Sequence, residues 1–127
     1  AKDLVKNDPK YGDWLHQGDA MLGKILEALD RNKLTDNTLI IATSDNGAEH
    51  RAYEPLRESK RSIYEGGHRE PYIARWPGHV PAGQTSGELI GHVDTLATVA
   101  ALTGQKLPAD AAPDSFANLN QSSDYQG

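Results

Sequence analysis

The feature that most constrains this chain is an uninterrupted apolar run at residues 38–43. It reads Thr38-Leu39-Ile40-Ile41-Ala42-Thr43, and its β-branched and aliphatic residues do not alternate with polar ones. A strand with one solvated face alternates between polar and apolar side chains, whereas a strand covered on both faces does not. The run therefore predicts a buried strand of the kind found in α/β folds.

An amphipathic helix is predicted before this strand. Asp13 is its expected N-cap, and Gly23 in its interior indicates either close packing or a tolerated irregularity. The turn formers Thr35-Asp36-Asn37 then separate the helix from the strand. Apolar residues of the helix recur at three- and four-residue spacing, as packing on another element requires: Trp14, Leu15, Met21, Leu22, Ile25, Leu26 and Leu29.

Two further elements follow a long polar loop, residues 48–67. The segment from Pro71 to Trp76 is a second predicted strand, ended by a Pro-Gly pair. A second helix is expected from Thr95 to Leu102, with Asp94 as its N-cap and Gly104 beyond its end.

The last part of the sequence differs in composition. After Leu107 it is rich in Pro, Asp, Ala, Asn, Gln and Ser, and Phe116 is its main apolar anchor. Such a composition buries too little apolar surface to order a chain firmly. We therefore expect one partial domain over residues 1–107 and a weakly ordered polar tail over residues 108–127.

The overall charge excludes some classes of partner. The chain has 13 Lys and Arg against 18 Asp and Glu, a net charge of -5, so neither nucleic acid nor an anionic membrane is an expected partner. No stretch approaches the roughly 20 apolar residues needed to cross a bilayer. The sequence has no cysteine, and it lacks a serine nucleophile elbow, a P-loop and a dinucleotide fingerprint.

Two side chains with oxygen donors directly follow the predicted strand. Asp45 and Asn46 offer the carboxylate and amide oxygens that Ca²⁺ and Mg²⁺ prefer, and Gly47 lets the backbone turn sharply. Loops at strand ends are where α/β folds build their sites. The same three residues are also ordinary turn formers. A calcium shell needs about six to eight oxygens, so further ligands are expected elsewhere.

Lys60 is the candidate anion-binding residue. Its compact charge would neutralise a sulfate or phosphate oxygen, and a solvated basic loop is the alternative for residues 57–62. The Gly66-Gly67 pair permits positive φ or the close approach of another segment. The five histidines form no H-x-x-x-H pair, so each is expected to be structural or solvent-facing rather than a ligand.

Four motifs occur in a fixed order: Thr38–Gly47, Leu56–Lys60, Tyr64–Pro71 and Arg75–Gly78. Together they closely resemble the type I sulfatase family, and the resemblance runs from about Tyr11 to about Ser115. It implies that this chain corresponds to the later part of that family's large N-terminal domain. The expected fold is a partial alkaline-phosphatase-like α/β sandwich, with helices packed on a mostly parallel sheet.

The resemblance implies specific roles for the candidate residues. Asp45 and Asn46 match the family's calcium ligands, and Lys60 matches its sulfate-binding lysine. The family's nucleophile is a formylglycine made from Cys or Ser in a C/S-x-P-x-R type motif, which precedes the matching region and has no counterpart here. The other calcium carboxylates and a histidine that assists the leaving group would also lie upstream. His16 is not that histidine, because its helix follows the catalytic histidine in the family.

The chemistry implied is hydrolysis of a sulfate ester, either of a carbohydrate or of an aryl alcohol. A hydrated formylglycine oxygen would attack sulfur while calcium and Lys60 stabilise charge on the sulfate oxygens. Because the attacking group is missing, the chain alone is predicted to be inactive. Its uncovered surfaces are expected to promote self-association. The sequence indicates no compartment, although a periplasmic or extracellular location would suit a full-length family member.

The sequence departs from the family at two places. The glycines usual after Arg57 are replaced by Glu58 and Ser59, which adds negative charge near the sulfate site. The family's Asp-x-x-Pro-Thr helix start reads Asp94-Thr95-Leu96-Ala97-Thr98, a change that looks structural.

Two other functions are open at this point. A phosphate or phosphonate ester hydrolase of the same superfamily is the nearer one, but such enzymes typically carry Asp-His-Gly where this chain has Asp45-Asn46-Gly47. The other is a non-catalytic truncated module, which the missing nucleophile favours.

Overall fold

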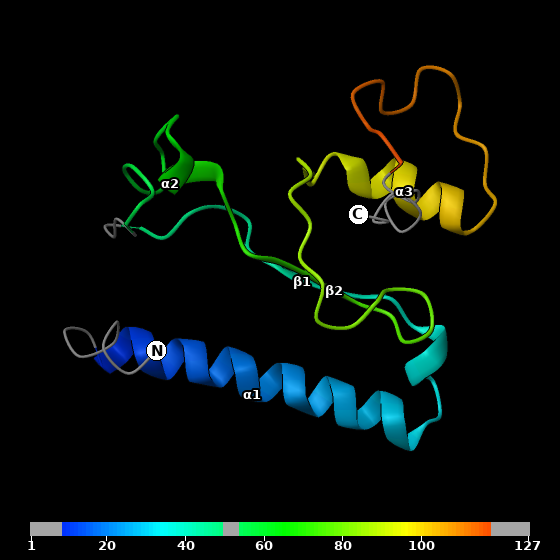
Figure 1. The fold of residues 1–127 in the computed structure, drawn as a ribbon, viewed down its shortest axis with the longest axis horizontal. Helices are drawn as coiled ribbons and strands as arrows, with labels where there is room; N and C mark the ends of the chain where they lie inside the picture. The colour runs from blue at the N-terminus through cyan, green and yellow to red at the C-terminus, as the bar shows by residue number, and fades with distance from the viewer. Residues whose placement is uncertain (1–8, 50–53, 118–127) are drawn as a thin grey trace. The chain divides into compact units, whose positions relative to one another are not determined.

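The chain divides into two compact units, residues 1–80 and residues 81–127. The computed structural model describes residues 9–49 and 54–117. Figure 1 shows the elements in their order along the chain: α1 (Pro9–Arg31), the 3-10 helix η1 (Thr35–Asn37), β1 (Ile40–Thr43), α2 (Glu65–His68), β2 (Tyr72–Arg75) and α3 (Asp94–Leu102). This mixture of helices and strands agrees with the predicted α/β class.

The first helix begins earlier than the sequence indicated. α1 starts at Pro9, so the prediction that Asp13 is the N-cap is wrong. Proline is favoured in the first turn of a helix because its missing N–H would have no helical partner there. Gly23 has open space around it, so it does not mark a close packing contact in the described structure.

A tight turn joins α1 to the sheet. Lys33 follows the helix in a left-handed conformation with a φ of 57°. The Thr38 hydroxyl donates a hydrogen bond to the carbonyl oxygen of Leu34 at 2.8 Å. The indole N–H of Trp76, just after β2, donates to the carbonyl oxygen of Asp36 at 3.0 Å. The turn is therefore hydrogen-bonded to the residues that flank one end of the sheet, where β1 begins and β2 ends.

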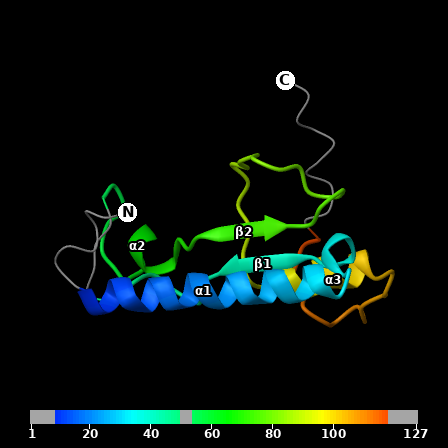
Figure 2. The same ribbon diagram turned by 90° about the horizontal axis from the view of Figure 1, so that it is seen from below.

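β1 and β2 form a two-stranded antiparallel sheet, and their arrows point in opposite directions in Figure 2. Ile40 lies opposite Arg75, and Thr43 lies opposite Tyr72. This pair therefore does not have the parallel arrangement expected for most of the sheet. Parallel strands need a crossover, usually a helix on the sheet, whereas the described connection between β1 and β2 contains just the four-residue α2.

The two strands are less buried than the apolar run predicted. β1 is half-buried along most of its length, and β2 is exposed. The expectation that residues 38–43 are covered on both faces is wrong for the described structure. The reason is that a strand is covered by layers packed closely on its faces, and no described helix has a Cα atom within 8 Å of those of β1 or β2.

The second unit contains α3. Asp94, the predicted N-cap, is the first residue of the helix, and Val93 occupies the N-cap position. The buried Asp94 carboxylate accepts hydrogen bonds from the backbone N–H groups of Gly91 at 2.9 Å and Phe116 at 3.0 Å. It therefore joins two loops, while the N-cap position predicted for Asp94 belongs to Val93. Gly104, beyond the helix end, has a φ of 68°, as predicted for a glycine at that place.

Polar contacts hold the tail as far as it is described. The Ser115 hydroxyl accepts a hydrogen bond from the Ala97 N–H, in the first turn of α3, at 3.0 Å; such N–H groups often lack a partner inside the helix. Phe116 is 70% exposed, so its ring is not the apolar anchor that the composition suggested. Residues 118–127 of the predicted tail lie outside the described residues.

Little apolar surface is buried in residues 9–49 and 54–117. Ala100 is the buried hydrophobic residue among them. The apolar face predicted for α1 exists, but four of its large residues are more than half exposed: Trp14, Leu15, Met21 and Ile25. Over the same residues, no helix has both the length and the apolar character that a membrane span needs.

Candidate functional site

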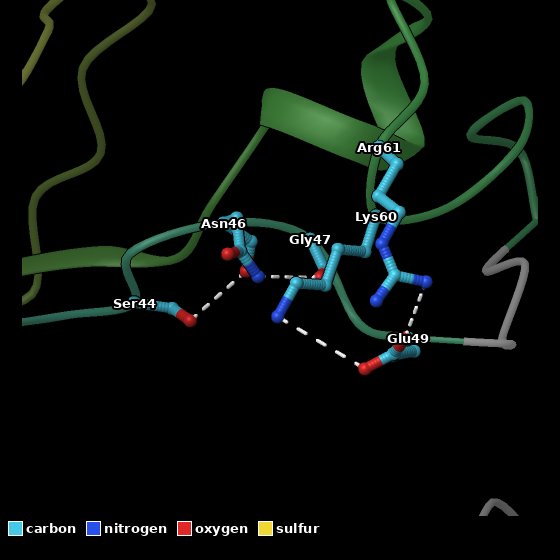
Figure 3. Close-up of polar contacts among 6 residues, drawn as sticks. All are labelled: Ser44, Asn46, Gly47, Glu49, Lys60 and Arg61. Atoms are coloured by element: carbon cyan, nitrogen blue, oxygen red, sulfur yellow. Dashed lines mark hydrogen bonds and ion pairs between the residues drawn. The ribbon is translucent and has the colours of Figure 1, made fainter.

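Three segments between β1 and β2 meet in one loop cluster: residues 44–49, 57–62 and 64–68. The N–H of Gly47 donates a hydrogen bond to the carbonyl oxygen of Gly67 at 3.0 Å, and the N–H of Lys60 donates to that of Ala48 at 3.1 Å. Figure 3 shows Lys60 and Arg61 beside the segment that carries Asn46 and Gly47. Backbone hydrogen bonds therefore bring the predicted anion-binding lysine to the loop that bears the predicted metal ligands.

The loop cluster requires glycine at three positions. A Cβ atom at Gly47 would overlap the carbonyl oxygen of Gly66, and one at Gly66 would overlap that of Glu58. A Cβ atom at Gly67 would overlap the carbonyl oxygen of Ser62. Backbone atoms cannot rotate away as a long side chain can, so these close approaches need residues without a Cβ. The glycine pair, a weak signal by itself, marks the packing of three chain segments.

Two residues near Lys60 adopt left-handed backbone conformations. Glu58 has a φ of 65° and Arg61 a φ of 73°. This conformation costs an L-amino acid about 1–2 kcal/mol and favours glycine. Glu58 occupies one of the two positions where the family resemblance leads us to expect glycine. The left-handed conformation at this position explains why glycine would be favoured there. The φ of Ser59, at the other position, is not positive.

Asp45 and Asn46 lie in the turn that directly follows β1. The Ser44 hydroxyl donates a hydrogen bond to the backbone carbonyl of Asn46 at 3.0 Å, and Asn46 Nδ2 donates to the carbonyl oxygen of Gly47 at 2.9 Å (Figure 3). Because the amide nitrogen is the donor in this bond, the side-chain oxygen is the atom of Asn46 that could coordinate a cation. Asp45 is exposed to solvent.

These two donors fit a hard cation, but they are too few to hold one alone. Carboxylate and amide oxygens are the ligands that calcium prefers, and its shell needs about six to eight of them. Among the described residues, no three His, Asp or Glu side chains come together as a potential metal site. Asp45 and Asn46 therefore fit part of a calcium site that further ligands must complete.

Lys60 lies beside an ion pair. Its Nζ is 4.0 Å from Glu49 Oε2, and Arg61 Nη1 is 2.6 Å from Glu49 Oε1 (Figure 3). The Lys60 side chain is 33% exposed, and the Arg61 side chain is 71% exposed. Exposed ion pairs contribute about 1 kcal/mol or less to stability. The contacts of Glu49 with Lys60 and Arg61 therefore affect the positions of these charged groups more than the stability of the fold.

A side-chain and a backbone contact close the loop that carries Lys60. The Arg57 guanidinium carbon lies 3.6 Å from the centroid of the Tyr64 ring, a cation–π contact. The carbonyl oxygen of Arg57 accepts a hydrogen bond from the Gly66 N–H at 2.9 Å. Next to this loop, His68 Nε2 donates to the carbonyl oxygen of Ile63 at 3.2 Å.

Sequence reasoning missed several residues of the cluster. Glu49, Arg61, Arg57 and Tyr64 were not singled out, because a contact between residues well apart in a loop leaves no periodic pattern. Of the histidines, His16 is exposed on α1 and the ring of His79 packs against Trp76, with centroids 4.1 Å apart. His50 lies outside the described residues.

Comparison with solved structures places the chain in the alkaline-phosphatase-like α/β class. The crystal structure of Ps i-CgsB in complex with k-i-k-neocarrahexaose superimposes with a TM-score of 0.68 at 42% identity, over 71% of this chain and 21% of that chain. A structure from the glycosaminoglycan metabolism of Bacteroides thetaiotaomicron superimposes with a TM-score of 0.74 at 40% identity, over 82% of this chain and 25% of that chain.

The sulfatase family model matches residues 3–105, and this chain belongs to the sulfatase family. The N-acetylgalactosamine-6-O-sulfatase of Bacteroides thetaiotaomicron is 42% identical over 124 residues, which are 86% of this chain and 24% of the relative. The human N-acetylgalactosamine-6-sulfatase is 42% identical over 112 residues, 83% of this chain and 22% of the relative. Human arylsulfatase A is 42% identical over 104 residues, 77% of this chain and 20% of the relative.

The chain thus spans about a quarter or less of the length of the relatives that it matches. This agrees with the expectation of a partial sulfatase domain. The names of these relatives also agree with the sulfatase interpretation and not with a phosphate or phosphonate ester hydrolase.

Proposed function

We propose that this chain supplies calcium- and sulfate-binding loops to a sulfuric ester hydrolase. In this assignment, Asp45 and Asn46 are calcium ligands and Lys60 binds an oxygen of the sulfate group. The observation that carries the proposal is the hydrogen bond from the Lys60 N–H to the Ala48 carbonyl oxygen at 3.1 Å. It holds the lysine beside the segment that bears both ligands.

When bound, calcium would supply positive charge and orientation to the sulfate group. Asp45 would contribute a carboxylate oxygen and Asn46 its amide oxygen, an orientation supported by the bond from Nδ2 to the Gly47 carbonyl. We assign the remaining ligands and the formylglycine nucleophile to the larger part of the relatives that this chain does not match.

Lys60 would stabilise the reacting sulfate group electrostatically. Its ammonium group offers three donors, and its charge opposes the negative charge on sulfate oxygens in the transition state. Such stabilisation works best when the charge is held in place before the reaction, because no reorganisation is then needed. The close packing of Gly47 against Gly66 supports a backbone position that is fixed in this way.

The proposed substrate is the sulfate ester of a carbohydrate. Two of the relatives are named as sulfatases of N-acetylgalactosamine, and one of the similar structures holds k-i-k-neocarrahexaose. The similarity to arylsulfatase A supports aryl sulfate as the second class of substrate.

The first test uses the purified 127-residue chain with an aryl sulfate, p-nitrophenyl sulfate, with and without calcium chloride. We expect no turnover in either condition, because the attacking group is absent. Calcium-dependent release of p-nitrophenol by this chain would show that the assignment of the nucleophile to another part of the protein is wrong.

The second test replaces the matching segment of the Bacteroides thetaiotaomicron relative with this chain and measures kcat/KM on sulfated N-acetylgalactosamine. Lys60→Ala is expected to lower kcat/KM by about 10²–10³-fold, and Asn46→Ala to raise the calcium concentration needed for half-maximal activity. Lys24→Ala, at an exposed lysine of α1, is the matched control and should change neither quantity. Equal kcat/KM for the Lys60→Ala and parent chimeras would contradict the proposal.

A further inference from the structure

One carboxylate of the loop cluster faces two neighbouring cations. Glu49 Oε1 is 2.6 Å from Arg61 Nη1, a distance typical of a charge-assisted hydrogen bond. Glu49 Oε2 is 4.0 Å from Lys60 Nζ, which is too long for a hydrogen bond but close enough for attraction between opposite charges. Glu49 is therefore bound to Arg61, while Lys60 is attracted to it without being bound.

We propose that Glu49 is a positioning counter-ion for Lys60, and that Arg61 restrains Glu49 so that Lys60 passes to the sulfate group when the anion arrives. The inference rests on the proposed function, in which Lys60 binds a sulfate oxygen. Glu49 and Arg61 act through Lys60 and are positioning residues, not catalytic ones.

The charges of these three side chains support the movement of Lys60 from Glu49 to the sulfate group. Lys60 and Arg61 contribute +1 each and Glu49 contributes −1, so the sum over these three side chains is +1, which favours an incoming anion. Without the Arg61 guanidinium, the sum would be zero, and Glu49 would be held less firmly away from Lys60. Without the Glu49 carboxylate, the sum would be +2, and the ammonium group would lose the carboxylate that lies beside it among the described residues.

The backbone builds this arrangement. Adjacent residues of an extended chain point to opposite sides, yet the side chains of Lys60 and Arg61 approach the same carboxylate (Figure 3). Arg61 has a left-handed conformation with a φ of 73°, a departure from extended geometry at the residue that follows Lys60. The hydrogen bond from the Lys60 N–H to Ala48 fixes the lysine opposite the residue that precedes Glu49.

The test is zero-length crosslinking with a water-soluble carbodiimide on the 127-residue chain. The reagent activates the Glu49 carboxylate, and a nearby Lys60 amine then forms an amide that peptide mass spectrometry quantifies. Sodium sulfate is titrated in, with sodium chloride at the same ionic strength as the control. We expect the Glu49–Lys60 crosslink to form in the parent chain, and sulfate to suppress it at concentrations where chloride does not.

The variants separate positioning from simple stability. Arg61→Gln should raise the crosslink yield, and raise the sulfate concentration for half-suppression, by about two- to fivefold, the range expected for an exposed ion pair. Arg61→Lys keeps the charge and should restore the parent values. Glu49→Gln should abolish this crosslink and identifies its peptide. The amide hydrogen exchange of Lys60 checks that each variant keeps its backbone.

The outcomes distinguish the two proposals. If sulfate suppresses the crosslink equally in the parent and Arg61→Gln chains, the role of Glu49 and Arg61 is overturned, while Lys60 remains a sulfate ligand. If sulfate acts no more strongly than chloride in any chain, the proposed role of Lys60 fails and this inference fails with it. If no Glu49–Lys60 crosslink forms in the parent while Lys60 couples to added acetate, the positioning proposal alone is overturned.

Discussion

Gly47 lies so close to Gly66 that a Cβ atom on Gly47 would overlap the carbonyl oxygen of Gly66. The first residue ends the Ser44–Gly47 turn after β1, and the second belongs to α2. Their approach, with the hydrogen bond from the Gly47 N–H to the Gly67 carbonyl oxygen, joins the segment of the predicted calcium ligands to the end of the loop that carries Lys60. The geometry of the loop cluster therefore depends on the absence of a side chain.

Gly47→Ala should open the loop cluster. The added methyl group meets backbone atoms, so one of the two segments must move, at a cost of about 1–3 kcal/mol. We expect faster amide hydrogen exchange at Lys60, whose N–H bonds to Ala48. Gly23→Ala, where the added methyl group meets open space in α1, is the control and should instead raise helicity. Unchanged exchange at Lys60 in Gly47→Ala would show that the approach of the two segments is not constraining.

Glu58→Gly should stabilise the same loop. Glu58 has a φ of 65°, and glycine adopts this conformation without the cost of about 1 kcal/mol that a Cβ imposes. The expected result is slower amide exchange at Gly66, which bonds to Arg57.

Two variants test the reason for that result. Ser59→Gly changes a residue whose φ is not positive and should give no gain. Glu58→Gln removes the charge but keeps the side chain, and it should leave the exchange rate close to the parent value. If Glu58→Gln protects Gly66 as strongly as Glu58→Gly does, charge and not backbone strain is the cause.

The presence of the helices and strands could be predicted from the sequence more accurately than the start of α1 or the burial of the strands. The apolar run predicted β1, the Pro-Gly pair after Trp76 predicted the end of β2, and Gly104 marked the end of α3, because these signals are local. The start of α1 was missed because Pro9 and Asp13 are both acceptable near a helix N-terminus. The burial of the strands was overestimated, since full burial needs layers packed closely on both faces, and no described helix has a Cα atom within 8 Å of those of β1 or β2.

The candidate site was predictable only in its individual residues. The order of the four motifs selected Lys60, Asp45 and Asn46 as candidates through family resemblance. The contacts of Glu49 with Lys60 and Arg61 had no such signal, because loop residues meet through backbone turns that leave no hydrophobic period. Those turns include the left-handed conformations of Glu58 and Arg61, which neither residue type favours by itself.

Replacing Arg57 should loosen the loop that carries Lys60. Its guanidinium carbon lies 3.6 Å from the centroid of the Tyr64 ring, and exposed cation–π contacts contribute about 0.5–1 kcal/mol. Arg57→Gln should therefore increase amide exchange at Gly66 by roughly two- to fivefold. Tyr64→Phe keeps the ring face and should behave like the parent. Upfield ring-current shifts of the Arg57 side chain in the parent, lost in Tyr64→Ala, would identify the contact directly.

The exposed face of α1 should drive self-association of the chain. Trp14 is 77% exposed and Ile25 is 53% exposed, and their spacing in the helix places them on one face with Met21. A contiguous apolar face of this kind favours association because contact between copies removes it from water. The parent chain is therefore expected to show a concentration-dependent increase in mass by static light scattering. The double variant Trp14→Gln, Ile25→Gln should reduce that increase.

The matched control for this prediction is Leu89→Gln. Leu89 is 98% exposed, so the variant removes an exposed apolar side chain without touching the α1 face, and it leaves the net charge unchanged, as the double variant does. If the α1 face is responsible, Leu89→Gln associates like the parent. If both variants reduce association equally, total apolar exposure and not this face is the cause. A monomeric parent at all concentrations would refute the prediction, because the α1 face would then be stable in water without a partner.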